Sequence, residues 1–420
     1  MKLSSARANL IIGTIQICLL SLGILICTHL TYKYSKVESD FTQDYAAAVA
    51  AQRGLSIYGD QLSQVANEFL PKRRYQNFHP PTTALFFQPI ALLPYSLAFM
   101  LFNLVGIVLY LAIVEVSALE LKLRNSTRNH LRALCLLWYP VAFCVGSGNF
   151  SIYLAFLIVL AWKMLSAKRS TFAGVLLGIA AALKLFPGLL IIHLFFDKDW
   201  KAIRSMVTTF LACLVAATTL VGLHDLLIYL TQVIGHDVED YSKFILNISI
   251  TGFATSLLTD TPWTFAPVNV PTLKVIVALT LNAAVLLLTC YKTKISLKDG
   301  NINNSYLLLT VSMILLSPIS WSHMFVVLVP ALIFVFQESF IAHKRKLPWC
   351  MLILLLMSLP DISIGNWLMQ YYEPGRAQAW TIVIHKAGFF GLALLWLQLF
   401  QIVSSKHSSY PPNIRSVRTL

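Results

Sequence analysis

Charged side chains interrupt the apolar segments of this 420-residue chain at two places that could support chemistry. Asp40 precedes an alanine-rich stretch that ends at Gly54, and a carboxylate at a helix N-terminus can stay ionised and act as a general base. Asp40 or Ser39 could instead simply cap that helix. Lys184 lies in an apolar run that breaks at Pro187. An ammonium there costs about 3 kcal/mol and indicates an anionic partner, although the side chain could also snorkel to a nearby interface.

Two further breaks carry polar or aromatic side chains. His323 follows Trp321 in a short turn between two apolar segments, where a histidine can donate to a phosphate oxygen. A lone histidine is more often structural, and a tryptophan at that depth is an ordinary interfacial anchor. Asn149 follows a Gly-Ser-Gly sequence, where the backbone can approach a ligand closely or where two antiparallel helices meet in a tight turn.

Two acidic strings resemble metal-binding sequences. Asp197 and Asp199 have the spacing of a D-x-D metal site, but Lys201 and Arg204 follow them, which favours a basic connector between helices. Residues 236–240 could bind a divalent ion, although a solvated acidic turn is the commoner explanation. The seven cysteines show no C-x-x-C spacing. The sequence therefore predicts neither a metal site nor a disulfide framework.

The composition indicates which class of protein must position these residues. Hydrophobic residues make up 57% of the chain and charged residues only 12%, and the mean hydropathy is +0.70. Apolar runs near the length that crosses about 30 Å of hydrocarbon recur along the chain. We predict an all-α polytopic membrane protein with one membrane domain over residues 1–420. The net charge of +14 comes from basic residues scattered among short loops, which argues against a nucleic-acid partner.

Lysines and arginines in short loops predict the orientation, because such loops stay in the cytoplasm. Both termini, including the tail of residues 403–420, are then cytoplasmic, and residues 31–81 and 223–270 form extracytoplasmic loops. Residues 82–93 make no net crossing, and residues 172–196 form a hairpin of two short helices that breaks at its middle. The expected crossings are residues 10–30, 95–118, 130–146, 149–166, 201–222, 271–291, 304–317, 322–338, 347–360 and 379–402.

Several short sequences occur in a characteristic order relative to these spans. They are Asp40-Phe41 with Tyr45-Ala46-Ala47, Phe78-His79-Pro80-Pro81, Pro89 to Pro94, Gly146-Ser147-Gly148-Asn149, Lys184-Leu185-Phe186-Pro187, Asn247-Ile248-Ser249 and Ser317 to His323. Together they resemble glycosyltransferase family 87, a group of integral membrane, mannosyltransferase-like proteins. The resemblance covers most of the chain. It implies a GT-C-like bundle of about twelve transmembrane helices with re-entrant or short helices and outward-facing loops.

The resemblance also implies an activity, which is transfer of a hexose, typically mannose, from a polyprenyl-phosphate donor to a hydroxyl of a glycan or glycolipid with inversion. It implies that Asp40 is the catalytic base. The candidates for binding the donor phosphate are Lys184, His323 and Arg376. The basic residues 72–74 are further candidates for the same role. The candidates for the sugar and acceptor pocket are His79, Asn149, Asn247 and Trp321. We expect no metal ion and no cofactor besides the donor, which acts as a co-substrate.

Two other classes of membrane protein share some of these features. A lipid-linked sugar flippase or transporter also needs an intramembrane cation and broken helices, but it requires access from both membrane faces. A membrane-bound acyltransferase needs its histidine on the side that receives acyl-CoA, whereas His323 is predicted to face outward. We therefore expect a multi-pass transferase in the inner membrane of a bacterium, with membrane lipid, the lipid-linked donor and a glycan or glycolipid acceptor as its partners.

Overall fold

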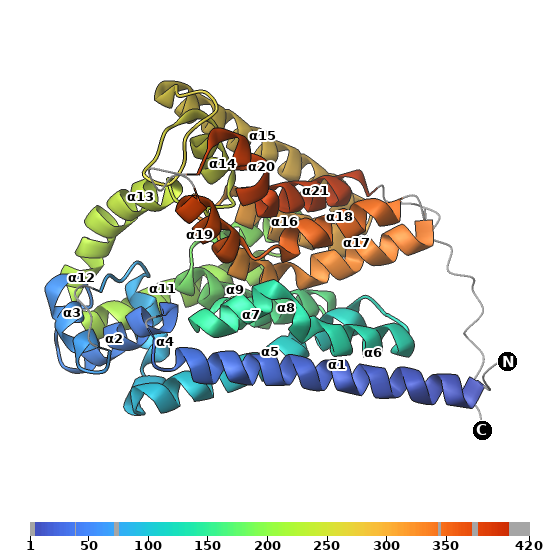
Figure 1. Ribbon diagram of the computed structural model, residues 1–420, viewed down its shortest axis with the longest axis horizontal. Coiled ribbons are helices and arrows are strands. Elements are labelled where there is room, and N and C mark those ends of the chain that lie inside the picture. Colours follow the sequence, from blue (N-terminus) through green and yellow to red (C-terminus); the bar gives the residue numbers. More distant parts are fainter. Residues whose placement is uncertain (1–4, 38, 71–74, 343–345, 372–376, 403–420) are drawn as a thin grey trace.

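The secondary structure is entirely helical in the part of the chain that the computed structural model describes. The described residues are 5–37, 39–70, 75–342, 346–371 and 377–402. Within them, Thr264 and Ala377 form one isolated bridge rather than a strand. Most long helices run along the long axis of the molecule (Figure 1). Helices satisfy their backbone polar groups internally, as a lipid environment requires, and the predicted all-α class is confirmed.

Five helical segments of the described chain are long and apolar enough to cross a membrane. They are α1 (Ser5–Tyr34), α5 (Tyr95–Glu120), α11 (Trp200–Val221), α15 (Pro271–Lys298) and the continuous pair η5 (Ser322–Leu328) and α17 (Val329–Ala342). Three bent pairs raise the number to eight if each pair is one span. These are α6 (Asn125–Leu134) and η2 (Cys135–Leu137) with α7 (Tyr139–Ser147), α18 (Leu347–Ser358) with α19 (Asp361–Tyr371), and η7 (Ala379–Thr381) and α20 (Ile382–His385) with α21 (Ala387–Gln401).

Shorter apolar helices complete the bundle. They are α8 (Ser151–Ser166), α9 (Ser170–Leu183), η3 (Phe186–Leu190) with α10 (Ile191–Phe196), and α16 (Ile302–Leu316). Each has 10–17 residues, whereas a straight helix needs about 20 to cross the hydrocarbon. Every predicted crossing coincides with a helical segment. The predicted number of about twelve crossings does not follow from helix lengths and stays a prediction.

The segment of residues 172–196 breaks where the sequence predicts. α9 ends at Leu183, and Lys184 has an extended backbone before η3 begins. α9 and α11 pack side by side in the same direction, because Gly174 lies against Ala202 and Gly178 against Met206. The chain from the start of α9 to the start of α11 therefore leaves one end of the bundle and returns to it. This is the hairpin that the sequence predicts, and it places Lys184 at the far end of α9.

The connection between α1 and α5 is mostly helical rather than irregular. It contains α2 (Asp40–Gln52), α3 (Gly59–Asn67), α4 (Pro81–Phe87) and η1 (Ile90–Leu92), which we call the cap. Most residues of α2 are buried. Its alanines have small side chains, which let neighbouring elements approach the helix closely. α4 is about 10 Å long, too short to cross a membrane, as predicted for residues 82–93. Figure 1 shows the cap at one end of the bundle, opposite the N-terminal end of α1.

The second long connection packs against the cap. It contains α12 (Leu223–Ile228), the π-helical η4 (Tyr229–Asp237), α13 (Val238–Ser242) and α14 (Ile250–Leu258). The carboxylate of Asp225, which is buried, accepts hydrogen bonds from the Ser56 hydroxyl at 2.6 Å and the Ile57 N–H at 2.8 Å. The two connections predicted to lie on one face of the membrane therefore meet at the same end of the bundle.

Candidate functional site

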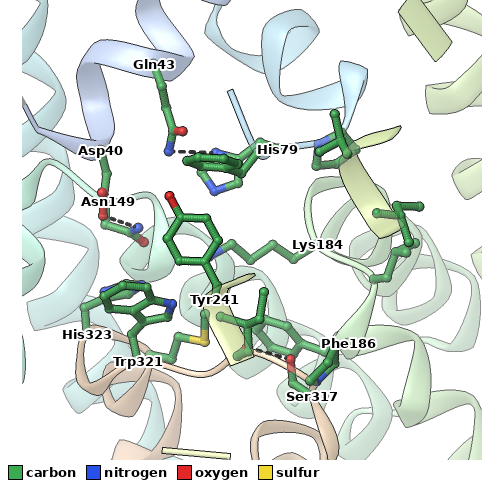
Figure 2. A pocket seen from close by; sticks show the side chains of 18 of the residues that line it. Asp40, Gln43, His79, Asn149, Lys184, Phe186, Tyr241, Ser317, Trp321 and His323 are labelled. Atoms are coloured by element: carbon green, nitrogen blue, oxygen red, sulfur yellow. Dashed lines mark hydrogen bonds between the residues drawn. The ribbon is translucent and has the colours of Figure 1, made fainter. Parts of the chain in front are cut away.

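A cavity of about 910 Å³ lies between the cap and the adjoining ends of the spans. Its walls come from segments that are far apart in the sequence, including the start of α2, the turn before α8, the break after α9 and the turn before η5. The predicted site residues that line it are Asp40, His79, Asn149, Lys184, Trp321 and His323 (Figure 2). Folding thus brings together residues from five separate breaks in the apolar pattern.

Asp40 is the first residue of α2, and its carboxylate faces the cavity rather than the helix end. The helix start is closed by Thr42, whose Oγ1 accepts from the Ser39 N–H at 3.0 Å. Asp40 Oδ2 instead accepts from Asn149 Nδ2 at 2.9 Å. The interpretation of the Asp40 side chain as a helix cap is therefore wrong, because its one described hydrogen bond leads to another part of the chain.

Aromatic packing fixes the start of α2. The Phe41 ring is fully buried, and its centroid lies 5.3 Å from that of Phe99 and 5.2 Å from that of Phe102, both on α5. The next residue, Thr42, shares a hydrogen bond of 2.8 Å with the Tyr95 hydroxyl, also on α5. These contacts hold the first turn of α2 against a long span, so Asp40 sits on a rigid support.

The amide of Asn149 is oriented by its own neighbours. Its Oδ1 accepts from the Ser151 N–H at 2.9 Å and from the Ser151 hydroxyl at 2.6 Å, so its Nδ2 must face Asp40. The preceding Gly148 has φ of +61°, a conformation that favours glycine. A Cβ on Gly148 would lie 2.7 Å from Phe41 Cβ. Glycine therefore lets this turn approach α2 closely enough for the two side chains to meet.

Burial raises the pKa of the Asp40 carboxyl above its ordinary value. The hydrogen bond from Asn149 and the charges of His79 and Lys184 act in the opposite direction, and the neighbouring Asp44 adds to the rise. Burial has the largest effect of these. A carboxylate with a raised pKa holds a proton more tightly, which suits a group that takes a proton during a reaction.

Lys184 projects into the cavity from the end of α9. Its Nζ lies 4.9 Å from the centroid of the Phe150 ring, within the range of a cation–π contact. In the described part of the chain no carboxylate comes within ion-pair distance of this ammonium. The Thr82 hydroxyl donates to the Ala182 carbonyl and so ties the cap to the end of α9. The ammonium is thus held in place with its charge available to a ligand.

His79 is oriented by a carboxylate that the sequence did not single out. Its Nδ1 shares a hydrogen bond of 2.7 Å with Oδ1 of the fully buried Asp44, which fixes the orientation of the ring. Gln43 Nε2 lies 3.5 Å from the same ring nitrogen and also lines the cavity. Gln43 and Asp44 follow Asp40 by three and four residues, the spacing that puts side chains on one face of a helix. That spacing was the available signal for both residues.

His323 is 4% exposed, and neither of its ring nitrogens has a hydrogen-bond partner among the described residues. Its ring packs edge-on against Phe143 at 5.3 Å and parallel to Trp321 at 6.4 Å. Trp321 also lies 6.1 Å from the ring of Tyr241, a cavity residue from α13 that no sequence pattern indicated. An unpartnered buried imidazole beside a cavity can be satisfied by a ligand.

The remaining predicted residues do not join this cluster. Asn247 is fully buried and does not line the cavity, because its Nδ2 donates to the Pro318 carbonyl at 2.9 Å and its Oδ1 accepts from the Ser320 N–H at 3.1 Å. It supports the cavity wall from behind. Arg376, residues 72–74 and the predicted tail of residues 403–420 lie outside the described residues.

The two acidic strings have structural explanations. Asp199 caps α11, since its Oδ1 accepts from the Ala202 N–H at 3.0 Å. The exposed Glu239 of α13 pairs with Lys243, which follows that helix, at 3.1 Å. No three histidine, cysteine, aspartate or glutamate side chains gather as metal ligands within the ranges that the structure describes. Asp199 therefore acts as a helix cap and Glu239 as the partner of a lysine.

In the described residues, a helical bundle with long apolar segments and a cavity at one end that charged and polar side chains enter fits a membrane protein whose site is built at the ends of its helices. The model of glycosyltransferase family 87 matches residues 77–318, more than half of the chain. The chain belongs to glycosyltransferase family 87, and the predicted resemblance is confirmed. The matched segment contains His79, Asn149 and Lys184 but neither Asp40 nor His323.

Two curated relatives are polyprenol-phosphate-mannose-dependent alpha-(1-2)-phosphatidylinositol pentamannoside mannosyltransferases. The protein from Mycolicibacterium smegmatis is 25% identical over 304 residues, which cover 70% of this chain and 68% of the relative. The protein from Mycobacterium tuberculosis is 25% identical over 311 residues, which cover 70% of this chain and 65% of the relative. The chain thus spans about two thirds of the length of these relatives. No solved structure matches. The two names are those of transferases and do not favour the transporter alternative.

Proposed function

We propose that the chain transfers mannose from a polyprenyl-phosphate donor to a hydroxyl of a glycolipid or glycan, with inversion at the anomeric carbon. Both relatives are named for their dependence on polyprenol-phosphate-mannose and for a mannosylated lipid acceptor. The donor sugar is linked through one phosphate rather than a diphosphate, so we propose that no metal ion is needed to neutralise the leaving group. No further cofactor takes part.

The observation that supports this proposal most strongly is the convergence of the Asp40 carboxylate and the Lys184 ammonium on one cavity (Figure 2). In the proposed reaction Asp40 takes the proton of the acceptor hydroxyl as its oxygen attacks the anomeric carbon. The bond from that carbon to the phosphate oxygen breaks, and negative charge grows on the polyprenyl phosphate. Lys184 stabilises that charge, since a fixed cation is most effective where charge develops.

His323 is proposed as the second group that binds the departing phosphate. Its two buried nitrogens have no protein partner in the described chain, and a phosphate oxygen would accept from the one that carries a proton. In the proposed sugar and acceptor pocket, His79 and Asn149 shape the pocket by hydrogen bonding. Trp321 offers a ring on which the apolar face of a sugar can stack. The predicted role of Arg376 at the phosphate stays a sequence-based prediction. Asn247 does not line the cavity and supports its wall through hydrogen bonds to Pro318 and Ser320.

The proposed orientation places the cavity on the extracytoplasmic side and both termini in the cytoplasm. The basic helix α6 packs beside the N-terminal half of α1, where Gln16 Nε2 lies 2.9 Å from His130 Nδ1, whereas Asp40 follows the other end of α1. Basic segments favour the cytoplasmic face, here of a bacterial inner membrane. Nucleotide sugars are confined to the cytoplasm, so a site that opens outward needs a donor carried by the membrane.

The experiment is an incubation of the purified protein with radiolabelled polyprenyl-phosphate mannose and a membrane lipid extract. We expect a labelled lipid product, and none when a labelled nucleotide sugar replaces the donor. Asp40→Asn should fold and lower turnover by about 10²–10⁴-fold, the usual contribution of a general base. Asp60→Asn, which changes an exposed carboxylate of the cap, should keep full turnover. Undiminished turnover in Asp40→Asn would exclude the proposed role of Asp40.

A further inference from the structure

Lys386 is a fully buried lysine that the proposed reaction does not use. It lies in the break between α20 and α21, outside the segment matched by the family and away from the cavity lining. Its Nζ donates to the carbonyl oxygens of Ile245 at 3.0 Å and Asn247 at 2.7 Å. No described carboxylate lies within ion-pair distance of it. Burying an ammonium without a counter-ion costs folding free energy, so we expect these two carbonyl contacts to serve a specific role.

The two carbonyls belong to an irregular segment that holds another part of the chain. Between α13 and α14, the Ile248 N–H donates to the Ser320 carbonyl at 2.9 Å, and the Asn247 side chain bonds both Pro318 and Ser320. The Ser249 hydroxyl donates to the Pro318 carbonyl at 3.1 Å. We call these contacts between residues 247–249 and residues 318–320 the Asn247 clamp. It joins two irregular segments by four hydrogen bonds.

The Asn247 clamp lies directly before Trp321 and His323 in the sequence, and Pro318 and Ile319 of its second segment also line the cavity. Trp321 follows Ser320, and His323 lies two residues further on. No described hydrogen bond holds the His323 ring, so the position of the ring depends on its backbone and on packing against Trp321 and Phe143. The backbone at this point is held by the clamp. A displacement of the clamp would therefore move the imidazole relative to Asp40 and Lys184 across the cavity.

An apolar residue would not reproduce the contacts of Lys386. An ammonium carries three donors and can bring together two carbonyls of one segment, whereas a methionine of similar length would leave both carbonyls without a partner. The start of α21 also packs closely on the same region, because a Cβ on Gly388 would lie 3.2 Å from Ile248 and 3.3 Å from Phe325. The last helix thus contacts both the clamp and the span that begins at Ser322 and contains His323.

We infer that Lys386 is a positioning residue, which holds Trp321 and His323 in the cavity through the Asn247 clamp. Its effect on activity rests on the proposed function, but its effect on the clamp does not. The matched control is Tyr306→Phe, which also removes a buried donor to a backbone carbonyl, that of Ile158 at 2.8 Å, away from the cavity lining. Lys386→Met and Tyr306→Phe can then be compared at a temperature where both are folded.

The first measurement is amide hydrogen exchange by mass spectrometry on the full chain. Lys386→Met should speed exchange in peptides covering residues 245–249 and 318–323 by about ten-fold or more, while Tyr306→Phe leaves both peptides at the wild-type rate. Wild-type exchange at residues 318–323 in folded Lys386→Met would overturn the inference. If Lys386→Met does not fold, Ser249→Ala removes one bond of the clamp and should speed exchange at residues 318–323, and unchanged exchange there would equally overturn it.

The second measurement is mannosyl transfer from radiolabelled polyprenyl-phosphate mannose. The value of kcat/KM should fall by about ten-fold or more in Lys386→Met and by less than about two-fold in Tyr306→Phe. If both variants lose activity only in proportion to their thermal stability, Lys386 is merely structural and the positioning role is wrong. A wild-type protein that transfers no mannose would refute the proposed function, and hydrogen exchange would still decide whether Lys386 holds the clamp.

Discussion

Replacing Asn149 by alanine should move the acid side of the pH–rate profile to higher pH. Asn149 Nδ2 donates to Asp40 Oδ2 at 2.9 Å and counteracts the rise in the Asp40 pKa that burial causes. Loss of this donor destabilises only the ionised carboxylate. A hydrogen bond to a charged group contributes about 1.5–3 kcal/mol, and one pKa unit corresponds to about 1.36 kcal/mol. The pKa of Asp40 should therefore rise by about one to two units, and by less if water fills the space.

The assay is kcat/KM for transfer from radiolabelled polyprenyl-phosphate mannose, measured between about pH 5 and pH 9. The base acts only when ionised, so Asn149→Ala should lose activity at low pH and regain it as the pH rises. The control is Ser151→Ala. The Ser151 N–H still donates to Asn149 Oδ1 at 2.9 Å, so the amide keeps its orientation and the acid limb should move by less than about 0.5 unit.

The outcome that would refute this reasoning is an Asn149→Ala profile lowered by the same factor at every pH, with its acid limb at the wild-type position. Asn149 would then shape the site without influencing the charge of Asp40. A shift of the limb to lower pH would contradict the sign of the argument, since loss of a donor to the ionised form raises the pKa.

Three further predictions test other parts of the site. Lys184→Met should insert normally and raise the KM for the donor by about 10–100-fold, and an unchanged donor KM would remove Lys184 from the phosphate site. Gly148→Ala should lower the free energy of unfolding by about 1–3 kcal/mol because of the φ of +61° and the close approach of Phe41, as thermal unfolding would show; wild-type stability would contradict this account. Incubation with a chelator should leave transfer unchanged, and activity restored only by an added divalent ion would exclude the metal-independent reaction.

Features that depend on short stretches of chain were predictable. Lys184 and Pro187 stand out because a charge and a helix breaker interrupt an apolar run, and the structure breaks the helix at that point. The start of α2 at Asp40 was predictable for a similar reason, since Ser39 precedes an alanine-rich stretch. Hydrophobicity, charge and helix-breaking residues act within about one helical turn, so the printed sequence is enough to locate them.

Roles that depend on a distant partner were not predictable. The spacing from Asp40 places Asp44 on the same face of the helix, but it does not identify a partner, and the role of Asp44 appears only when His79 lies 2.7 Å away. Asn247 is the reverse case, because the sequence singles it out and the structure keeps it out of the cavity. The sequence places it in the sugar pocket, whereas both ends of its amide are taken up by Pro318 and Ser320. An amide looks the same in a sequence whether it faces a ligand or the backbone.

Membership of glycosyltransferase family 87, the apolar helices, the positions where those helices break and the side chains that interrupt them can all be read from the printed residues. Which of those interruptions meet depends on how the helices pack in three dimensions. Asp40 and Asn149 are 109 positions apart, and their hydrogen bond exists because aromatic packing on α5 and the left-handed Gly148 bring two segments together. Such contacts follow from how helices pack across the whole bundle, and packing is a property that no local pattern of residues contains.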